Sequence, residues 1–257
     1  MRSTEQTQDS LSTSKALTHG LEILQLLTNS PAPLTATEIA GRVELHPSSV
    51  SRILHILAQA GYVRKPSYHS FSADYGIVTL AGRALMNFPL VTKPRKALQE
   101  LAQASGGLRV SLATLWQSQI IYLLHLQRDQ DPLTFAVAGY PLHLSSAGLR
   151  LLLERPRREA LEVLRESRAR NGWERPTVRV PETEGACLEA ARKLVRHDGL
   201  VLDGWQGAQR LSAAIPIEVE GQERLALALS GPSGAVPPSD VLLLLQQGRR
   251  AVEAALS

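Results

Sequence analysis

The sequence predicts an α+β protein with two domains. The first is a small helical domain closed by a hairpin, and the second is a larger domain in which helices flank a sheet. A chain of 257 residues is long for one small helical domain, so two domains are the natural expectation. Apolar residues recur at helical spacing up to Leu57, whereas from Leu108 onward short apolar runs typical of strands alternate with helical segments. These two patterns in series predict the fold class.

The first helix follows a polar segment. Residues 1–14 are rich in Ser, Thr and Gln, a composition that buries little apolar surface, so we expect this segment to be disordered. The helix after it has one apolar face at near-heptad spacing, formed by Leu17, Leu21, Leu24 and Leu27.

Two short helices joined by a tight turn come next. Thr35 and Glu38 fit a capping box, in which the Thr side chain caps the first amides and the Glu reaches back. Pro47 suits the first position of the following helix, where a missing N–H is no loss. An apolar stripe then repeats at i, i+3, i+4 and i+7, formed by Val50, Ile53, Leu54 and Leu57.

The opposite stripe of this second helix is polar and consists of Ser48, Ser49, Ser51, Arg52, His55 and Gln59. Short hydroxyls around one fork-shaped cation are what a helix in the major groove of DNA needs. Many amphipathic helix pairs of soluble domains look similar. The pair alone therefore leaves both interpretations open.

A basic hairpin after the helix pair favours DNA binding. Residues 62–65 and 71–73 read as short strands around a turn, with basic side chains available to phosphates. Three helices and such a hairpin make a winged helix-turn-helix, which we assign to residues 15–76. The predicted DNA-contacting residues are Thr35, Ser48, Ser49, Ser51, Arg52, His55, Arg64, Lys65 and His69.

A linker separates the predicted domains. Residues 77–88 read as a helix with Leu80, Ala84, Leu85 and Phe88 along one side, within a linker of residues 77–91. This helix is also a candidate dimer contact. The second domain then spans residues 92–257 and starts with a helix over residues 92–104.

Six strands are predicted in the second domain, at residues 108–116, 119–127, 133–138, 199–203, 209–219 and 223–230. Short turns join several of them, so the sheet is expected to be mainly antiparallel. Helices are predicted at residues 145–154, 157–170 and 181–197 and after Pro237. The expected architecture is a six-stranded sheet flanked by helices.

Charge and composition exclude several classes of protein. Residues 1–96 hold 10 Lys and Arg against 6 Asp and Glu, and residues 97–257 hold 18 against 18. The net charge of +4 therefore lies in the predicted DNA-binding part, which supports nucleic acid as the partner. A single Cys187 allows no internal disulfide and fits an inert helix position in a reducing cytosol. Neither a membrane span nor a signal peptide is expected, so we predict a cytoplasmic protein.

Enzymatic function is not expected either. The seven His residues show no metal-ligand spacing with Asp, Glu or Cys187, so no metal is predicted. The chain has no phosphate loop or dinucleotide fingerprint, and no cofactor is predicted. Ser230, which is followed by Gly231 and Pro232, does not form a nucleophile elbow.

Both halves of the chain resemble the IclR-type bacterial transcriptional regulators. The recognition helix of that family has Pro, a variable residue, Ser, Ser or Thr, a small apolar residue, a variable residue, Arg and two aliphatics. Residues 48–54 match this pattern from its Ser onward, with Pro47 directly before Ser48. In the second half the resemblance is carried by residues 140–143, Ser146, Gly148 and residues 199–203, 212–217 and 229–232.

The resemblance implies that the second domain is a GAF-like sensor that binds a small organic molecule between its sheet and the loops over it. Carried over by motif, the contacts are Gly139, Asp203, Ser212 and Ser230. This chain departs from the family at Leu144, Leu149, Ala228 and residues 204–207, where polar or acidic residues are usual. We therefore expect a ligand that is more apolar than those of relatives, or none.

The predicted function is a sequence-specific regulator that binds double-stranded DNA at a palindromic operator as a homodimer or homotetramer and senses a small organic ligand. One alternative is a DNA-binding regulator with a degenerate, ligand-free pocket. Another is a protein-interaction module that has lost DNA affinity.

Overall fold

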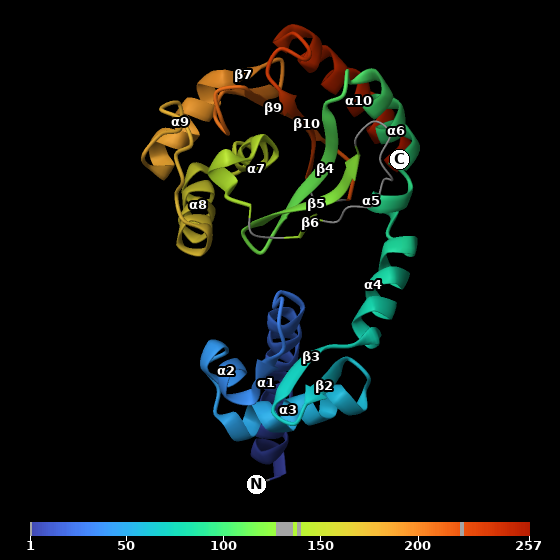
Figure 1. Ribbon diagram of the computed structural model, residues 1–257, viewed down its shortest axis with the longest axis vertical. Coiled ribbons are helices and arrows are strands. Elements are labelled where there is room, and N and C mark those ends of the chain that lie inside the picture. The colour runs from blue at the N-terminus through green and yellow to red at the C-terminus, as the bar shows by residue number, and fades with distance from the viewer. Residues whose placement is uncertain (1, 127–135, 138–139, 222–223) are drawn as a thin grey trace. The chain divides into compact units, whose positions relative to one another are not determined.

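The computed structural model describes residues 2–126, 136–137, 140–221 and 224–257. The chain divides into two compact units, Met1–Asn87 and Phe88–Ser257 (Figure 1). Within the described ranges, none of the helices combines the length and apolar character needed to span a membrane.

Unit 1 is a winged helix-turn-helix, as predicted. Its elements are α1 (Arg2–Thr28), β1 (Leu34–Thr35), α2 (Ala36–Arg42), α3 (Pro47–Gln59), β2 (Val63–Ser67), β3 (Ser70–Ala73) and α4 (Tyr75–Asn87). The three strands form an antiparallel sheet in the order β1-β3-β2. The β2-β3 hairpin is the wing.

The core of unit 1 confirms the apolar stripe predicted for α3. Val50 and Leu54 are fully buried. They pack in one cluster with α1, α2, β1 and β2 through Ile23, Leu27, Leu34, Ile39, Ala40 and Val63. Helical spacing was therefore a reliable guide to the buried face of this helix.

Helix α1 differs from its prediction in two ways. It begins at Arg2, although residues 1–14 were expected to be disordered. Residues 2–19 contain no Pro or Gly, and extending an existing helix needs no new nucleus. Its core side is formed by Ile23 and Leu27, whereas Leu17 and Leu21 of the predicted face are 68% and 55% exposed.

Unit 2 contains α5 (Pro89–Thr92), α6 (Arg95–Ala104), β4 (Arg109–Trp116), β5 (Gln119–Leu126), β6 (Ala136–Val137), the 3₁₀ turn η1 (Leu142–Leu144), α7 (Ser146–Leu152), α8 (Arg157–Asn171), α9 (Glu184–Leu194), β7 (Val195–Arg196), β8 (Gly199–Asp203), β9 (Arg210–Ile217), β10 (Leu225–Pro232) and α10 (Pro238–Leu256). The sheet order is β6-β5-β4-β10-β9-β8-β7, with antiparallel pairing throughout its described ladders.

The sheet contains the predicted strands and one more. β7 lies where the sequence predicted the end of a helix over residues 181–197. His197 and Asp198 adopt φ values of 47° and 65°, which reverse the chain, so that residues 195–196 pair with β8. β6 falls within the strand predicted at residues 133–138; residues 133–135 and 138 lie outside the described residues.

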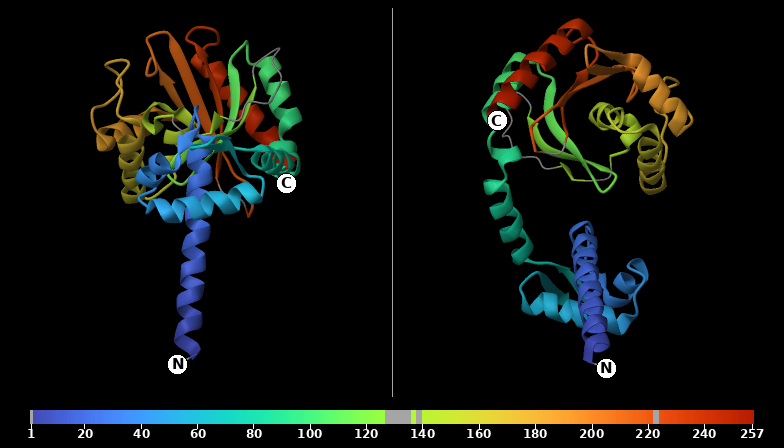
Figure 2. Two further views of the ribbon diagram at one scale, coloured as in Figure 1. Left: turned by 60° about the horizontal axis from the view of Figure 1, so that its bottom comes forward. Right: turned by 180° about the vertical axis from the view of Figure 1, so that it is seen from behind.

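Helices cover both faces of this sheet (Figures 1 and 2). One face packs on α6 and α10 through residues such as Leu101, Leu227 and Leu245. The other packs on α7, α8 and α9 through residues such as Leu149 and Ala226. Since side chains alternate along a strand, each strand of the centre contributes to both layers.

Candidate functional site

Helix α3 starts with a side-chain cap. His46 precedes Pro47, and its Nδ1 accepts from the Ser48 amide at 3.3 Å. The Ser48 hydroxyl lies 2.8 Å from the same nitrogen. One of the predicted DNA-contacting serines is thus engaged in the cap. Pro47 occupies the first turn as predicted.

The outer face of α3 is polar and exposed. With 100° between successive residues, Arg52, His55 and Gln59 lie opposite the buried Val50 and Leu54. All three, together with Ser49 and Ser51 on the flanks, are exposed. Thr35 sits at the start of α2, where the predicted capping box is confirmed by bonds between Thr35 and Glu38 in both directions.

The wing is a tight hairpin with ordered basic side chains. Its turn is closed by the Ser67 and Ser70 hydroxyls, 2.6 Å apart. Arg64 Nε donates to the Ser72 hydroxyl at 3.1 Å, and Lys65 Nζ lies 4.7 Å from the centre of the Tyr68 ring. His69 packs edge-on against that ring at 4.6 Å. Tyr68, which the sequence analysis missed, is therefore the organising side chain of the wing tip.

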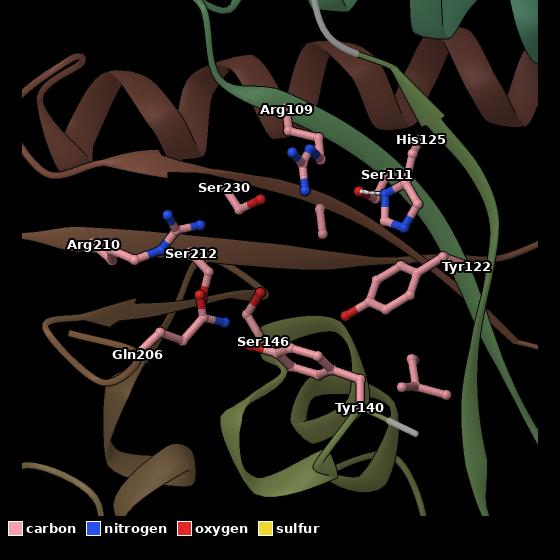
Figure 3. A pocket seen from close by; sticks show the side chains of 12 residues that line it. Arg109, Ser111, Tyr122, His125, Tyr140, Ser146, Gln206, Arg210, Ser212 and Ser230 are labelled. Atoms are coloured by element: carbon pink, nitrogen blue, oxygen red, sulfur yellow. Dashed lines mark hydrogen bonds between the residues drawn. The ribbon is translucent and has the colours of Figure 1, made fainter. Parts of the chain in front are cut away.

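Unit 2 contains a cavity of about 390 Å³ on the sheet face that carries α7. We call it the sheet cavity (Figure 3). It lies between β4, β5, β9 and β10, the first turn of α7 and the loop before β9. Its lining residues are Arg109, Ser111, Ile120, Tyr122, His125, Tyr140, Ser146, Gln206, Arg210, Ser212, Ala228 and Ser230.

Several polar side chains of the sheet cavity are held by hydrogen bonds. The Ser111 hydroxyl lies 2.7 Å from His125 Nδ1, and the Tyr122 hydroxyl lies 2.9 Å from the Ser145 hydroxyl that caps α7. Gln206 Nε2 donates to the Leu144 carbonyl at 2.7 Å. The buried hydroxyl of Ser212 has no hydrogen-bond partner among the described residues.

Burial determines the protonation states of three ionisable side chains that line the sheet cavity. It lowers the pKa of His125 to about 4, with a smaller contribution from the positive charge of Arg109. It also raises the pKa of Tyr122 and, together with the neighbouring Tyr122, raises the pKa of Tyr140 to about 12. Around pH 7 the imidazole is therefore neutral and both phenols keep their protons.

The sheet cavity gathers two of the four predicted ligand contacts. Ser212 and Ser230 line it side by side, as paired residues of β9 and β10. Gly139 lies outside the described residues. Asp203 is not in the lining of the sheet cavity: its carboxylate accepts from the Ser233 hydroxyl at 2.6 Å and lies 3.6 Å from Arg179 Nη1.

Strand alternation explains why Asp203 was wrongly grouped with the serines. Asp203 pairs with Leu211, whereas Leu202 pairs with Ser212. Residues paired across a ladder point to the same face, and successive residues point to opposite faces. The Asp203 side chain therefore lies on the opposite face of the sheet from Ser212.

The expectation of a more apolar ligand stays a prediction, although the described lining of the sheet cavity is rich in polar side chains. Eight polar lining residues were not among the predicted contacts, and two of them are arginines; the eight are Arg109, Ser111, Tyr122, His125, Tyr140, Ser146, Gln206 and Arg210. A usable signal was present, because β4 and β9 both begin with Arg, an apolar residue and Ser. This period-two pattern places a cation and a hydroxyl on one face.

The remaining ionisable groups offer no metal chemistry. In the described part of the chain, no group of three His, Cys, Asp or Glu side chains could hold a metal ion. Cys187 is buried, and burial raises the pKa of its thiol to about 12. It therefore stays protonated and unreactive.

Comparison with known proteins agrees with both units. Residues 16–67 match the IclR helix-turn-helix domain family. The HTH-type transcriptional regulator BhcR of Paracoccus denitrificans is 29% identical over 85% of this chain and 78% of its own length. The structure of an IclR family transcriptional regulator from Brucella abortus is 25% identical, with a TM-score of 0.76 over 94% of this chain and 92% of that one.

An IclR homologue from Microbacterium hydrocarbonoxydans, solved as a complex with 4-hydroxybenzoate, shares the fold. It is 21% identical, with a TM-score of 0.70 over 94% of this chain and 98% of that one. BhcR is named as a regulator and not as an enzyme, in agreement with the prediction that this chain is not an enzyme. The helix-turn-helix match, the similarity along most of the chain and the shared fold together support a DNA-binding transcriptional regulator of the IclR type.

Proposed function

We propose that this regulator binds a palindromic operator as a homodimer or homotetramer in the cytoplasm, and that a small organic ligand in the sheet cavity changes its affinity for DNA. The observation that carries the DNA-binding part is the exposed polar face of α3, with Arg52 at its centre. An Arg on such a helix can clamp a guanine edge with two hydrogen bonds. Lys65 and His69 on the wing are suited to phosphates.

Operator binding by Arg52→Ala tests this assignment. The operator is first selected from a random duplex library with the full-length chain. If Arg52 reads a base, we expect the variant to lose about 1–3 kcal/mol of specific binding and to relax preference at one position. Lys65→Ala is the comparison, because losing a phosphate contact weakens all sequences alike and flattens the salt dependence. Unchanged operator affinity of a folded Arg52→Ala variant would refute the assignment.

The ligand-sensing part is supported by the sheet cavity itself and by the relative that holds 4-hydroxybenzoate. Its volume suits a small organic molecule, and its polar groups converge from four strands. Thermal-shift screening of organic acids against the full-length chain, followed by operator titration with each hit, tests it. If no compound stabilises the chain, the degenerate-pocket alternative is the better interpretation.

A further inference from the structure

We propose that the sheet cavity selects an organic dianion with a flat body, and that Arg109 and Arg210 impose this selection. The two negative charges would lie close together at one end of the molecule. This inference rests on the proposed function in taking the sheet cavity as the effector site.

The two arginines flank a row of hydroxyls on the sheet. Arg109 pairs with Ser230, and Ser230 pairs with Ser212. Neighbouring strands are about 4.8 Å apart, so the row from Arg109 through Ser230 to Ser212 is about 10 Å long. Arg210 lies two residues before Ser212 and therefore on the same face. Figure 3 shows Ser230 between the two guanidinium groups.

No described residue pairs with the positive charge of this region. Among the described residues, neither Arg109 nor Arg210 takes part in any ion pair or side-chain hydrogen bond. The described residues of the lining include no Asp or Glu. A monoanion can match only one of the two guanidinium charges, whereas a dianion can match both and can accept bidentate hydrogen bonds from each.

The buried hydroxyl of Ser212 is an independent observation that favours a ligand oxygen in the sheet cavity. The Ser212 residue is only 3% exposed and lines the sheet cavity, and its hydroxyl has no partner among the described residues. Leaving a buried hydroxyl unpaired is unfavourable. An acid group placed beside Ser230 would lie one strand away from Ser212, whose hydroxyl is available to donate a hydrogen bond to it.

The far wall of the sheet cavity is suited to a flat molecule. The Tyr122 ring lies 4.5 Å from the His125 ring and 6.4 Å from the Tyr140 ring, centre to centre, and Ile120 completes this wall. Since His125 is neutral around pH 7, with a pKa of about 4, this wall adds no charge. The ligand body packs against rings while its acid groups face the arginines.

Calorimetric titration of the full-length chain with a matched set of one-ring compounds tests the proposal. The set is phthalate and isophthalate, which carry two nearby carboxylates, terephthalate with opposed carboxylates, benzoate with one, and phenyl phosphate. We expect phthalate, isophthalate or phenyl phosphate to bind about tenfold or more tighter than benzoate. Comparison of the carboxylates with phenyl phosphate tells which kind of acid group the cavity takes.

Two variants decide whether the arginines impose this preference. Arg109→Gln and Arg210→Gln should each bring the dianion affinity down to that of benzoate, while Arg250→Gln, an exposed arginine of α10 outside the cavity, should not. Equal affinity for benzoate and the dianions would overturn the proposal. So would a preference that survives in both variants, or no binding by any probe to the folded chain.

Operator titration separates this proposal from the proposed function. If a dianion binds in an Arg109-dependent way but leaves operator affinity unchanged, the inference stands and the regulatory role of the cavity fails. If monoanions alone bind and shift operator affinity, the regulatory role stands and the dianion inference fails.

Discussion

His125 shows how its surroundings keep one side chain of the sheet cavity uncharged. Its ring is hydrogen-bonded to the Ser111 hydroxyl and lies tilted against the Tyr122 ring. Burial and the nearby positive charge of Arg109 disfavour the imidazolium and lower the pKa to about 4. A ligand with a flat apolar body therefore meets a neutral ring at any pH near 7.

This pKa shift makes folding stability depend on pH. Between about pH 6.5 and pH 4 the unfolded chain binds a proton at position 125 and the folded chain does not, so the free energy of unfolding falls as the pH falls. The slope is at most about 1.4 kcal/mol per pH unit, and smaller here because part of the ring reaches solvent. His125→Gln should reduce this slope, measured by denaturant unfolding at several pH values. Identical slopes in both proteins would contradict the shift.

At the residue scale, the sequence indicated cavity residues that belong to recognisable strand motifs. It missed residues whose place depends on how the strands face and pair. Ser212 and Ser230 were identified because they belong to recognisable strand motifs. Asp203 was misplaced because a difference of one residue along a strand changes the face. The period-two pattern could have placed Arg109 and Arg210 each on one face with a serine. Their positions on either side of Ser230 depend on the register of β4, β10 and β9, which sequence spacing does not specify.

At the scale of elements, the start of α4 is held tightly against the turn that ends α3. The Gly76 amide donates to the Gly61 carbonyl at 2.9 Å, and Gly61 adopts a φ of 79°. A β-carbon added at Gly76 would overlap the Gly61 carbonyl oxygen and lie 2.9 Å from its carbon. Both partners are backbone atoms, so the clash cannot be relieved by a side-chain rotation.

Gly76→Ala should therefore destabilise unit 1, by about 1–3 kcal/mol as for other overpacked sites. Gly82→Ala is the matched control in the same helix, because nothing lies within 4 Å of its added β-carbon. Replacing a helix glycine with alanine there should stabilise by about 0.5–1 kcal/mol. Thermal unfolding of both variants measures the difference, and an unaffected Gly76→Ala protein would mean that the contact is looser than described.

Sequence patterns were most reliable for elements that have local start signals. The capping box at Thr35 predicted where α2 starts, and the proline predicted where α3 starts, because those signals act within one turn. β7 was not predictable, because it forms only when the chain reverses at His197 and pairs with β8. The predicted apolar face of α1 is rotated about the helix axis relative to the face that is buried, because only packing chooses between two overlapping apolar faces.

At the scale of the whole molecule, apolar surface remains exposed on the helices outside the two cores. Helix α4 has no buried residue, and Val78, Leu80 and Met86 are 68%, 61% and 80% exposed. Scattered exposed apolar residues are ordinary, but a helix without a buried face gains little from folding alone. A partner that covers one side of α4 would supply the missing burial, and a second copy of this chain fits the two-fold operator.

We therefore expect the full-length chain to be at least a dimer, because one recognition helix spans too few base pairs to find a site in a genome. Leu80→Glu, on the side of α4 predicted to meet the partner, should shift the chain toward monomer and weaken binding to the full palindrome more than to a half-site. Met86→Glu adds the same charge about 120° away around the helix and should leave the assembly intact. Sedimentation at micromolar concentration measures both. A wild-type monomer that still binds the palindrome specifically would remove α4 as a dimer contact and require each chain to recognise the operator independently.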